Sequence, residues 1–222
     1  MRPTKAPADF SAAPLLLPAD FYNIFIYNYI TLLMDYKRYI KRMNDVIRNY
    51  GLDNEVILKA MEKVLRHHFV PEDSGFDMDE IYGDHPLPIG ADQTISQPYT
   101  VAFMLDLLEL SPGMNVLEIG AGSGWNSALI KEIIGKNGMI TTVEYVSKLA
   151  AIARKHLKKA GYSEKDVNVV VADGSIGYEK NAPYDRIIAT CGSPDILEPW
   201  KEQLKPDGII VAPVGRDIQT MT

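Results

Sequence analysis

The sequence predicts an α/β fold in which a mostly parallel sheet carries helices on both faces. From about residue 99 onward, short continuous apolar runs alternate with longer segments of helical periodicity. Continuous apolar strands are typical of parallel sheets, because both faces of such a sheet are buried. One of these runs, residues 114–119, leads directly into a glycine-rich turn and then into a helical segment, which is the order expected of a doubly wound sheet.

Residues 1–35 are expected to form an N-terminal extension that is mobile or loosely packed. Residues 2–20 are rich in Pro and Ala and show no apolar period. Residues 21–34 are apolar, but Asn23 and Asn28 interrupt them, and a membrane-spanning helix needs about 20 apolar residues. A loose extension, a start assigned too early (with Met34 or Met43 as the true start) and a membrane contact all remain open. Stable membrane association is not expected.

Residues 36–98 are expected to hold two helices and a long loop. Apolar residues recur at steps of three and four between residues 36 and 66, with an interruption at residues 51–53. Residues 71–98 carry many glycines and prolines, among them Gly83, Pro86 and Gly90, so we expect no regular structure there. Long loops in compact domains are usually functional.

Residues 99–222 are expected to form the sheet domain. In chain order we expect a helix at residues 101–110, a strand at 114–119, a helix at 127–134, a strand at 139–143, a helix at 146–160, strands at 167–171 and 184–189, a short helix at 196–203 and a strand at 208–213.

Composition excludes several classes of protein. A chain of 222 residues can bury a core without a metal or a disulfide. The lone Cys191 is interpreted as a small buried residue, and a single cysteine suits the reducing cytoplasm. The net charge of −6 and the lack of a long basic block argue against a nucleic acid partner. We expect a cytoplasmic monomer without a metal site.

The glycine turn indicates a bound cofactor. Glu118 and Ile119 are followed by Gly120, Ala121, Gly122, Ser123 and Gly124. Glycines at such a turn let the backbone approach a ligand closely. A dinucleotide fingerprint requires a third glycine at position 125, which is Trp125, so a dinucleotide oxidoreductase ranks last among the candidate functions. A tight turn without a ligand is the alternative.

Two acidic residues at the ends of later strands indicate which class of ligand binds. Glu144 lies about 20 residues beyond the glycine turn, the spacing of a carboxylate that binds ribose hydroxyls. Asp173 and Gly174 end the next strand, where a carboxylate can accept from an adenine amino group and glycine leaves room for the ring. A solvated charge at Glu144 and a turn aspartate at Asp173 are the alternatives. Together these positions predict an adenosine-bearing cofactor.

Several segments resemble known enzymes. The spacing G-x-G-x-G after Glu118 resembles motif I of class I methyltransferases. RHHFVP at 66–71, YGDHPLPIG at 82–90, QTISQP at 93–98, APYDRII at 182–188 and EQLKP at 202–206 resemble the protein-L-isoaspartate (D-aspartate) O-methyltransferase family over residues 54–222. The resemblance implies a Rossmann-like class I methyltransferase sheet, S-adenosyl-L-methionine as cofactor, and damaged, isoaspartyl-containing proteins as substrates.

The resemblance also implies roles for individual residues. Thr94 and Ser96 are the expected catalytic residues, with the Ser96 hydroxyl donating to an acceptor carboxylate. The expected substrate contacts are Pro88, Ile89, Thr94 and Ser96. The expected cofactor contacts are Ile95, Ser96, Glu118, Gly120, Ala121, Gly122, Ser123, Gly124, Glu144, Tyr145, Asp173, Gly174 and Gln219. Ser96 as the N-cap of the helix near Pro98 is the alternative for that residue. His85 is interpreted as a turn histidine, and Arg66, His67 and His68 as packing at a helix end.

The chemistry of the isoaspartyl carboxylate explains why the sequence shows no evident general base. No evident His–carboxylate pair is available as a general base. An isoaspartyl carboxylate, with a pKa of roughly 4, is already ionised at neutral pH, so no base is needed. The enzyme then has to position this carboxylate and exclude water.

The sequence departs from the family pattern at Asp92, where the family has glycine, and at the end of the chain. Asp92 is expected to alter the loop or crowd the substrate. The chain ends at Met221 and Thr222, where the resemblance implies further strands, so truncated C-terminal strands with an exposed sheet edge are expected. Two alternatives to isoaspartyl methylation therefore remain: methyl transfer to another acceptor, and cofactor binding without catalysis.

Overall fold

The computed structural model describes residues 36–222. The chain divides into two compact units, Met1–Lys37 and Arg38–Thr222, and the second contains both sheets. The expected extension of residues 1–35 lies outside the described residues. The expected subdivision of the remainder at residue 98 stays a prediction.

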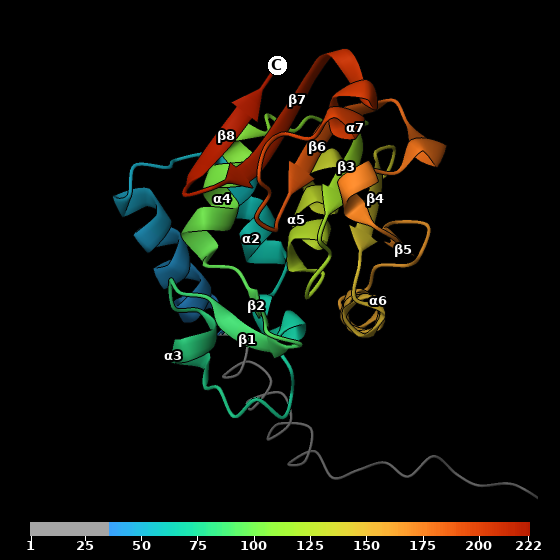
Figure 1. Ribbon diagram of the computed structural model, residues 1–222. Coiled ribbons are helices and arrows are strands. Elements are labelled where there is room, and N and C mark those ends of the chain that lie inside the picture. The colour runs from blue at the N-terminus through green and yellow to red at the C-terminus, as the bar shows by residue number, and fades with distance from the viewer. Residues whose placement is uncertain (1–35) are drawn as a thin grey trace, which may run out of the picture. The chain divides into compact units, whose positions relative to one another are not determined.

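A six-stranded sheet forms the centre of this unit (Figure 1). Its order is β5-β4-β3-β6-β7-β8, and all pairs are parallel except β7 with β8. The strands are β3 (Asn115–Ile119), β4 (Met139–Glu144), β5 (Asn168–Val171), β6 (Tyr184–Ala189), β7 (Leu204–Val214) and β8 (Asp217–Met221). The chain order reverses beside β3, so the carboxyl ends of β3, β4 and β6 border a crevice in which such sheets bind ligands.

Apolar strand residues explain why this sheet forms. Leu117, Ile187 and Ile210 belong to one buried cluster that spans three neighbouring strands, and Trp200 packs into it from α7. The helices that pack on the strands are α5 (Trp125–Ile134) against β4, α6 (Ser147–Lys159) against β4 and β5, and α7 (Glu198–Glu202) against β7. The α/β prediction is confirmed.

The N-terminal part of the unit is helical. Residues 38–49 of this unit are helical, and α2 (Glu55–Lys63) follows after a turn. The Asn54 side chain caps α2 by accepting from the backbone N–H groups of Val56 and Ile57. The short 3-10 helix η1 (Arg66–Phe69) comes next. The prediction of two helices joined by a turn is therefore confirmed.

The prediction that residues 71–98 lack regular structure is wrong. They contain α3 (Met78–Ile81) and an antiparallel hairpin of β1 (Leu87–Gly90) and β2 (Gln93–Ile95). Asp77 and Glu80 form a capping box that stabilises α3. The hairpin turn consists of Ala91 and Asp92, whose φ angles are 52° and 55°. Positive φ at both central residues suits the right-handed twist of a two-residue hairpin.

The structure also shifts several element boundaries. Helix α4 (Pro98–Leu107) begins three residues before the predicted start, because Pro98 is well suited to the first turn of a helix. Strand β7 is longer than predicted, and β8 lies where no strand was expected. Strand β8 pairs antiparallel with β7 and forms one edge of the described sheet.

Strand β5 forms the other edge. The Val171 side chain is 47% exposed there. The guanidinium of Arg154, on α6, donates to the Val169 carbonyl at 2.6 Å.

Within residues 36–222, no helix is long and apolar enough to cross a bilayer. The same residues contain no cluster of three or more His, Cys, Asp or Glu side chains arranged to hold a metal ion.

Candidate cofactor and acceptor site

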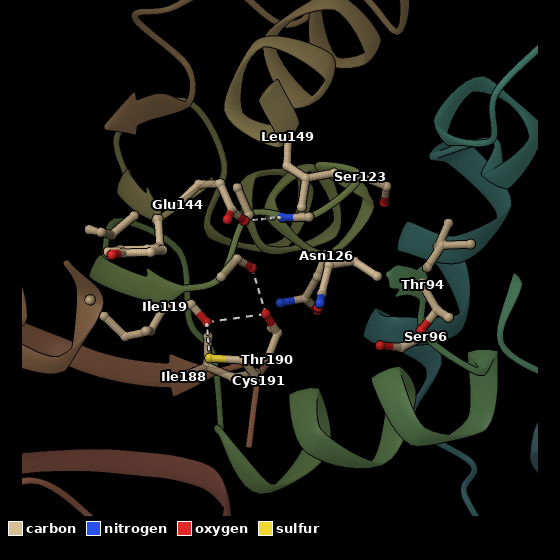
Figure 2. Close-up of a pocket in the computed structure, with 18 of the residues that line it drawn as sticks. Thr94, Ser96, Ile119, Ser123, Asn126, Glu144, Leu149, Ile188, Thr190 and Cys191 are labelled. Carbon is tan, nitrogen blue, oxygen red and sulfur yellow. Dashed lines mark hydrogen bonds between the residues drawn. The ribbon is translucent and has the colours of Figure 1, made fainter. Parts of the chain in front are cut away.

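A cavity of about 480 Å³ lies at the carboxyl ends of the central strands. This volume is within the range of small-molecule sites. Figure 2 shows Glu144 on one side of the cavity and Thr94 and Ser96 on the other. The residues that line it are Gln93, Thr94, Ile95, Ser96, Thr100, Val101, Met104, Ile119, Gly120, Ala121, Gly122, Ser123, Trp125, Asn126, Val143, Glu144, Tyr145, Val146, Leu149, Asp173, Gly174, Ser175, Ile188, Thr190, Cys191 and Pro213.

The glycine turn between β3 and α5 borders the cavity, and its conformation requires glycine. Gly120 has φ 96° and Gly124 has φ 87°, in the region that L side chains rarely adopt. A Cβ on Gly120 would lie 2.7 Å from the Thr190 hydroxyl, and a Cβ on Gly124 would lie 3.3 Å from the Ala153 carbonyl. Gly120 lines the cavity, whereas Gly124 faces α6 behind it. The turn therefore borders the cavity at Gly120 and Gly122 and packs against α6 at Gly124.

Glu144, at the end of β4, is fixed by two backbone donors. One carboxylate oxygen accepts from the Gly122 N–H at 2.9 Å, and the other accepts from the Val146 N–H at 2.9 Å. The side chain is only 6% exposed. Each carboxylate oxygen has a second lone pair. The group can therefore accept from two neighbouring hydroxyls of a ligand while it holds the glycine turn.

Asp173 and Gly174 follow β5. The Asp173 carboxylate accepts from the Ser175 N–H at 2.9 Å, and hydrogen bonds from Ser175 lower the pKa of this exposed carboxyl. It is ionised at neutral pH and lines the cavity. A Cβ on Gly174 would lie 2.5 Å from Ile119 Cγ2, so glycine permits close packing between the two strand ends. This steric role differs from the expected one of leaving room for a ring.

Glu118 is buried behind the cavity and does not line it. The side chain is 0% exposed, and it accepts hydrogen bonds from Asn126 Nδ2 at 2.8 Å and from the Ser127 hydroxyl. Burial raises the pKa of this carboxyl to about 7, although both donors favour its charged form. Asn126 does line the cavity. Glu118 therefore orients Asn126, whose side chain borders the cavity.

The acceptor side of the cavity comes from β2 and the residue that follows it. Thr94, Ile95 and Ser96 all line the cavity, as predicted. The Ser96 hydroxyl makes no hydrogen bond to any described residue, so it is available to a ligand. Ser96 is not the N-cap of α4, because Gln97 occupies that position. The side chain that caps α4 is Asp84, whose carboxylate accepts a hydrogen bond from the Tyr99 N–H at 2.8 Å.

Besides Glu118 and Gly124, three predicted site residues, Pro88, Ile89 and Gln219, do not line this cavity. Pro88 and Ile89 line a neighbouring groove of about 440 Å³ together with Phe76 and Lys148. Gln219 is exposed on β8 and pairs with Ala212 on β7. Asp92 is exposed at the tip of the hairpin and does not line the cavity, so it does not crowd the ligand space.

Sequence reasoning gave no cavity role to several lining residues. Asn126 and Thr190 lie far apart in the chain, and Met104 comes from α4. Cys191 also lines the cavity and is exposed, so its interpretation as a buried residue is wrong. The spacing of Asn126 eight residues after Glu118, on the first turn of a helix, was the available signal for its contact with that carboxylate.

The donor and acceptor set fits a nucleoside ligand. A buried carboxylate with free lone pairs suits a ribose diol, and an exposed, ionised carboxylate suits an amino group on a base. The position that a Cβ on Gly122 would occupy is open, because only Ile89 Cδ1 lies within 4 Å of it, at 3.8 Å. Glycine at this position leaves that space to a ligand. These features match an adenosine-bearing cofactor better than a metal or a phosphate.

Known proteins share both the sequence and the fold. The family model for protein-L-isoaspartate(D-aspartate) O-methyltransferase matches residues 38–222. The protein-L-isoaspartate O-methyltransferase of Methanosarcina mazei is 54% identical over 162 residues, which are 73% of this chain and 65% of that protein. The enzyme of the same name from Methanococcoides burtonii is 50% identical over 171 residues, covering 77% of this chain and 81% of that protein.

Solved structures agree with these relatives. A protein-L-isoaspartate O-methyltransferase structure matches with a TM-score of 0.72 at 31% identity, over 79% of this chain and 55% of that one. A protein from Plasmodium falciparum, in complex with S-adenosyl-L-homocysteine, matches with a TM-score of 0.70 over 84% of this chain and 89% of that one. Its 19% identity makes it a likeness of fold alone. The family match over most of the chain is decisive: this chain belongs to the protein-L-isoaspartate (D-aspartate) O-methyltransferase family.

Proposed function

We propose that this chain transfers the methyl group of S-adenosyl-L-methionine to the free carboxylate of L-isoaspartyl residues, and of D-aspartyl residues, in damaged proteins. The observation that carries the proposal is the arrangement of the cavity. Glu144 and Asp173 suit an adenosine at one side, and the Thr94 and Ser96 hydroxyls face the same space from the other. Family membership supports the same reaction.

The residues of the chain serve to hold and position the two reactants. When bound, the cofactor supplies an activated methyl group on a sulfonium. Glu144 is placed to accept from the ribose hydroxyls, and Asp173 to accept from the adenine amino group. The Ser96 hydroxyl donates to one oxygen of the acceptor carboxylate, which leaves the other oxygen free to attack.

No proton has to be removed from the acceptor. A carboxylate with a pKa of roughly 4 carries its nucleophilic lone pair at neutral pH. The cavity residues around Ser96 are mainly apolar, including Ile95, Val101 and Met104, and they exclude water from the reacting atoms. Orientation and exclusion of water are therefore the main contributions of the protein.

We further infer that the enzyme acts as a monomer in the cytoplasm. The mass of the enzyme in solution, measured by light scattering, tests this state, and the mass of a single chain is the expected result. The single cysteine suits a reducing compartment.

A paired-peptide assay tests the proposed reaction. The full chain is incubated with cofactor labelled in its methyl group and with two peptides that differ only in an Asp or an isoAsp linkage. Label is expected in the isoAsp peptide alone. Equal labelling of both peptides would point to another acceptor, and cofactor binding without transfer to either peptide would point to a non-catalytic protein. Both results contradict the proposal.

A further inference from the structure

Arg66 is a buried cation beneath the acceptor side of the cavity. Its side chain is 0% exposed. Nε donates to the Ile81 carbonyl at 2.7 Å, Nη1 to the Ser96 carbonyl at 2.8 Å and Nη2 to the His85 carbonyl at 3.2 Å. All three acceptors belong to the segment that leads into the hairpin and out of it again. One guanidinium thus ties the start of this segment, at Ile81 and His85, to its end at Ser96.

The fourth contact of Arg66 is with the cofactor side of the cavity. Its Cζ lies 4.5 Å from the centre of the Trp125 ring. Trp125 is the first residue of α5 and lines the cavity directly after the glycine turn. The Trp125 indole N–H donates to the Val64 carbonyl, which fixes the ring from another direction. Arg66 therefore lies between the cofactor wall and the segment that carries Ser96.

Stability alone gives a weak reason for a charge at this position. None of the ion pairs among the described residues includes Arg66. Tyr82 and Asp84 favour its charge, and the Asp84 carboxylate already accepts hydrogen bonds from Gln97 and Tyr99. Burial lowers the pKa of Arg66 to about 9, so the chain bears the desolvation of a guanidinium held mainly by carbonyl groups. The rigid, planar set of donors on an arginine can hold several carbonyl groups in fixed positions, which a flexible lysine side chain cannot do.

We propose that Arg66 is a positioning residue, which sets the distance and orientation of the Thr94–Ser96 segment relative to the cofactor wall formed by Trp125. This inference rests on the proposed methyl transfer. With the Ser96 carbonyl held, the backbone position from which the Ser96 side chain enters the cavity is fixed. Reactions that depend on in-line geometry are sensitive to misplacement on the scale of 1 Å.

Arg186 offers a matched control. It also donates to backbone carbonyls, with Nε to Leu108 at 2.7 Å and Nη1 to Asp185 at 2.8 Å. It does not line the cavity, and it lies on β6 near the amino end of the strand. A lysine at either position keeps the charge and loses the planar fork. A merely structural role of Arg66 therefore predicts a lowered Tm with a kcat that stays, like that of Arg186→Lys, at the wild-type value.

The experiment measures kcat, the cofactor Kd and Tm for wild type, Arg66→Lys, Arg186→Lys, Ser96→Ala and the double variant Arg66→Lys/Ser96→Ala. Arg66→Lys is expected to lower kcat about tenfold to a hundredfold, with the cofactor Kd changed less than about threefold. Arg186→Lys should keep the wild-type kcat. Because Arg66 acts through Ser96, the double variant should be hardly slower than Ser96→Ala alone.

Equal kcat values for Arg66→Lys and Arg186→Lys would overturn the inference, as would additive losses in the double variant. A parallel loss of cofactor binding in Arg66→Lys would overturn it too. If Arg66→Lys does not fold, Arg66→Gln keeps a planar donor and is subjected to the same comparison. An inactive wild-type chain would instead count against the proposed function, so the two failures are distinguishable.

Discussion

The carboxylate of Asp84 accepts the backbone N–H of Tyr99 at 2.8 Å, so helix α4 is capped from a point fifteen positions earlier in the chain. The other oxygen of the same carboxylate accepts from Gln97 Nε2 at 2.7 Å. Loss of a helix cap usually costs about 1 kcal/mol. We expect Asp84→Ala to lower the free energy of unfolding by about 1–2 kcal/mol, measured by urea denaturation. Asp207→Ala, an exposed aspartate on β7, is the control and should stay within about 0.5 kcal/mol of wild type.

Ser96→Ala separates the two roles considered for that residue. The hydroxyl caps no helix, so Tm should stay within about 1 °C of wild type. A hydrogen bond to a charged group contributes about 1.5–3 kcal/mol, so kcat for the isoAsp peptide should fall about tenfold to a hundredfold. Ser111→Ala, on an exposed loop, should leave both quantities unchanged. A lowered Tm with an unchanged kcat would exclude the proposed hydrogen bond to the acceptor.

Glu144→Gln should weaken cofactor binding at least tenfold, by calorimetric titration. Both oxygens of Glu144 accept backbone N–H groups, and an amide would present its own NH₂ group to one of these donors. The glycine turn loses a restraint at the same time. Glu179→Gln, an exposed control, should bind normally. An unchanged Kd in Glu144→Gln would contradict the assignment of this carboxylate to the ribose.

Glu118 makes stability depend on pH. Its pKa is about 7 in the folded protein against an ordinary value of 4.5, mainly because of burial. Between these values the folded state holds a proton that the unfolded chain has lost, so the contribution of Glu118 to stability falls as pH rises through this interval. The shift corresponds to about 3 kcal/mol. Relative to wild type, Glu118→Gln should therefore gain on the order of 3 kcal/mol between pH 4.5 and pH 7.5, in denaturant titrations at both values. A constant difference would show that Glu118 has an ordinary pKa.

The left-handed backbone conformation of the turn residue Asp92 is expected to lower the stability of the protein. Its φ of 55° lies in the left-handed region, which costs about 1 kcal/mol for residues with a Cβ and less for aspartate. Asp92→Gly should raise the free energy of unfolding by up to about 1 kcal/mol. Activity should not change, because Asp92 does not line the cavity. Asp92→Ala is the matched control and should be less stable than wild type, since alanine tolerates this conformation poorly.

The sequence predicted those parts of the fold whose burial is uniform along the strand. Strand β3 was placed within one residue of its observed bounds, because four of its five residues are buried and most of them are apolar. The hairpin of β1 and β2 was missed, because Ala91 and Asp92 lack the usual Asn-Gly or Asp-Gly signal of a tight turn. Strand β8 is largely polar, and its pairing with β7 decides its conformation.

The residues of the candidate site also divide into those that the sequence predicted and those that it did not. Glu144 and Asp173 were expected at the ligand site because Glu144 ends β4 and Asp173 comes shortly after β5, and the carboxyl ends of parallel strands meet at one edge of the sheet. Thr190 and Met104 reach the cavity through packing between distant segments, which spacing along the chain does not reveal. The contacts of Arg66 have the same cause. Three carbonyls in an irregular segment accept from its guanidinium, and no periodic pattern marks them.

The hydrogen bond from Arg154 to the Val169 carbonyl bears on self-association. An edge strand with free acceptors and exposed valines is a template on which a second chain can add a strand. Here the guanidinium occupies one acceptor of β5 and brings a positive charge to that edge. An incoming strand would have to displace this charge before it could pair in register. The protein thus carries a deterrent to β-aggregation at the edge of its own sheet.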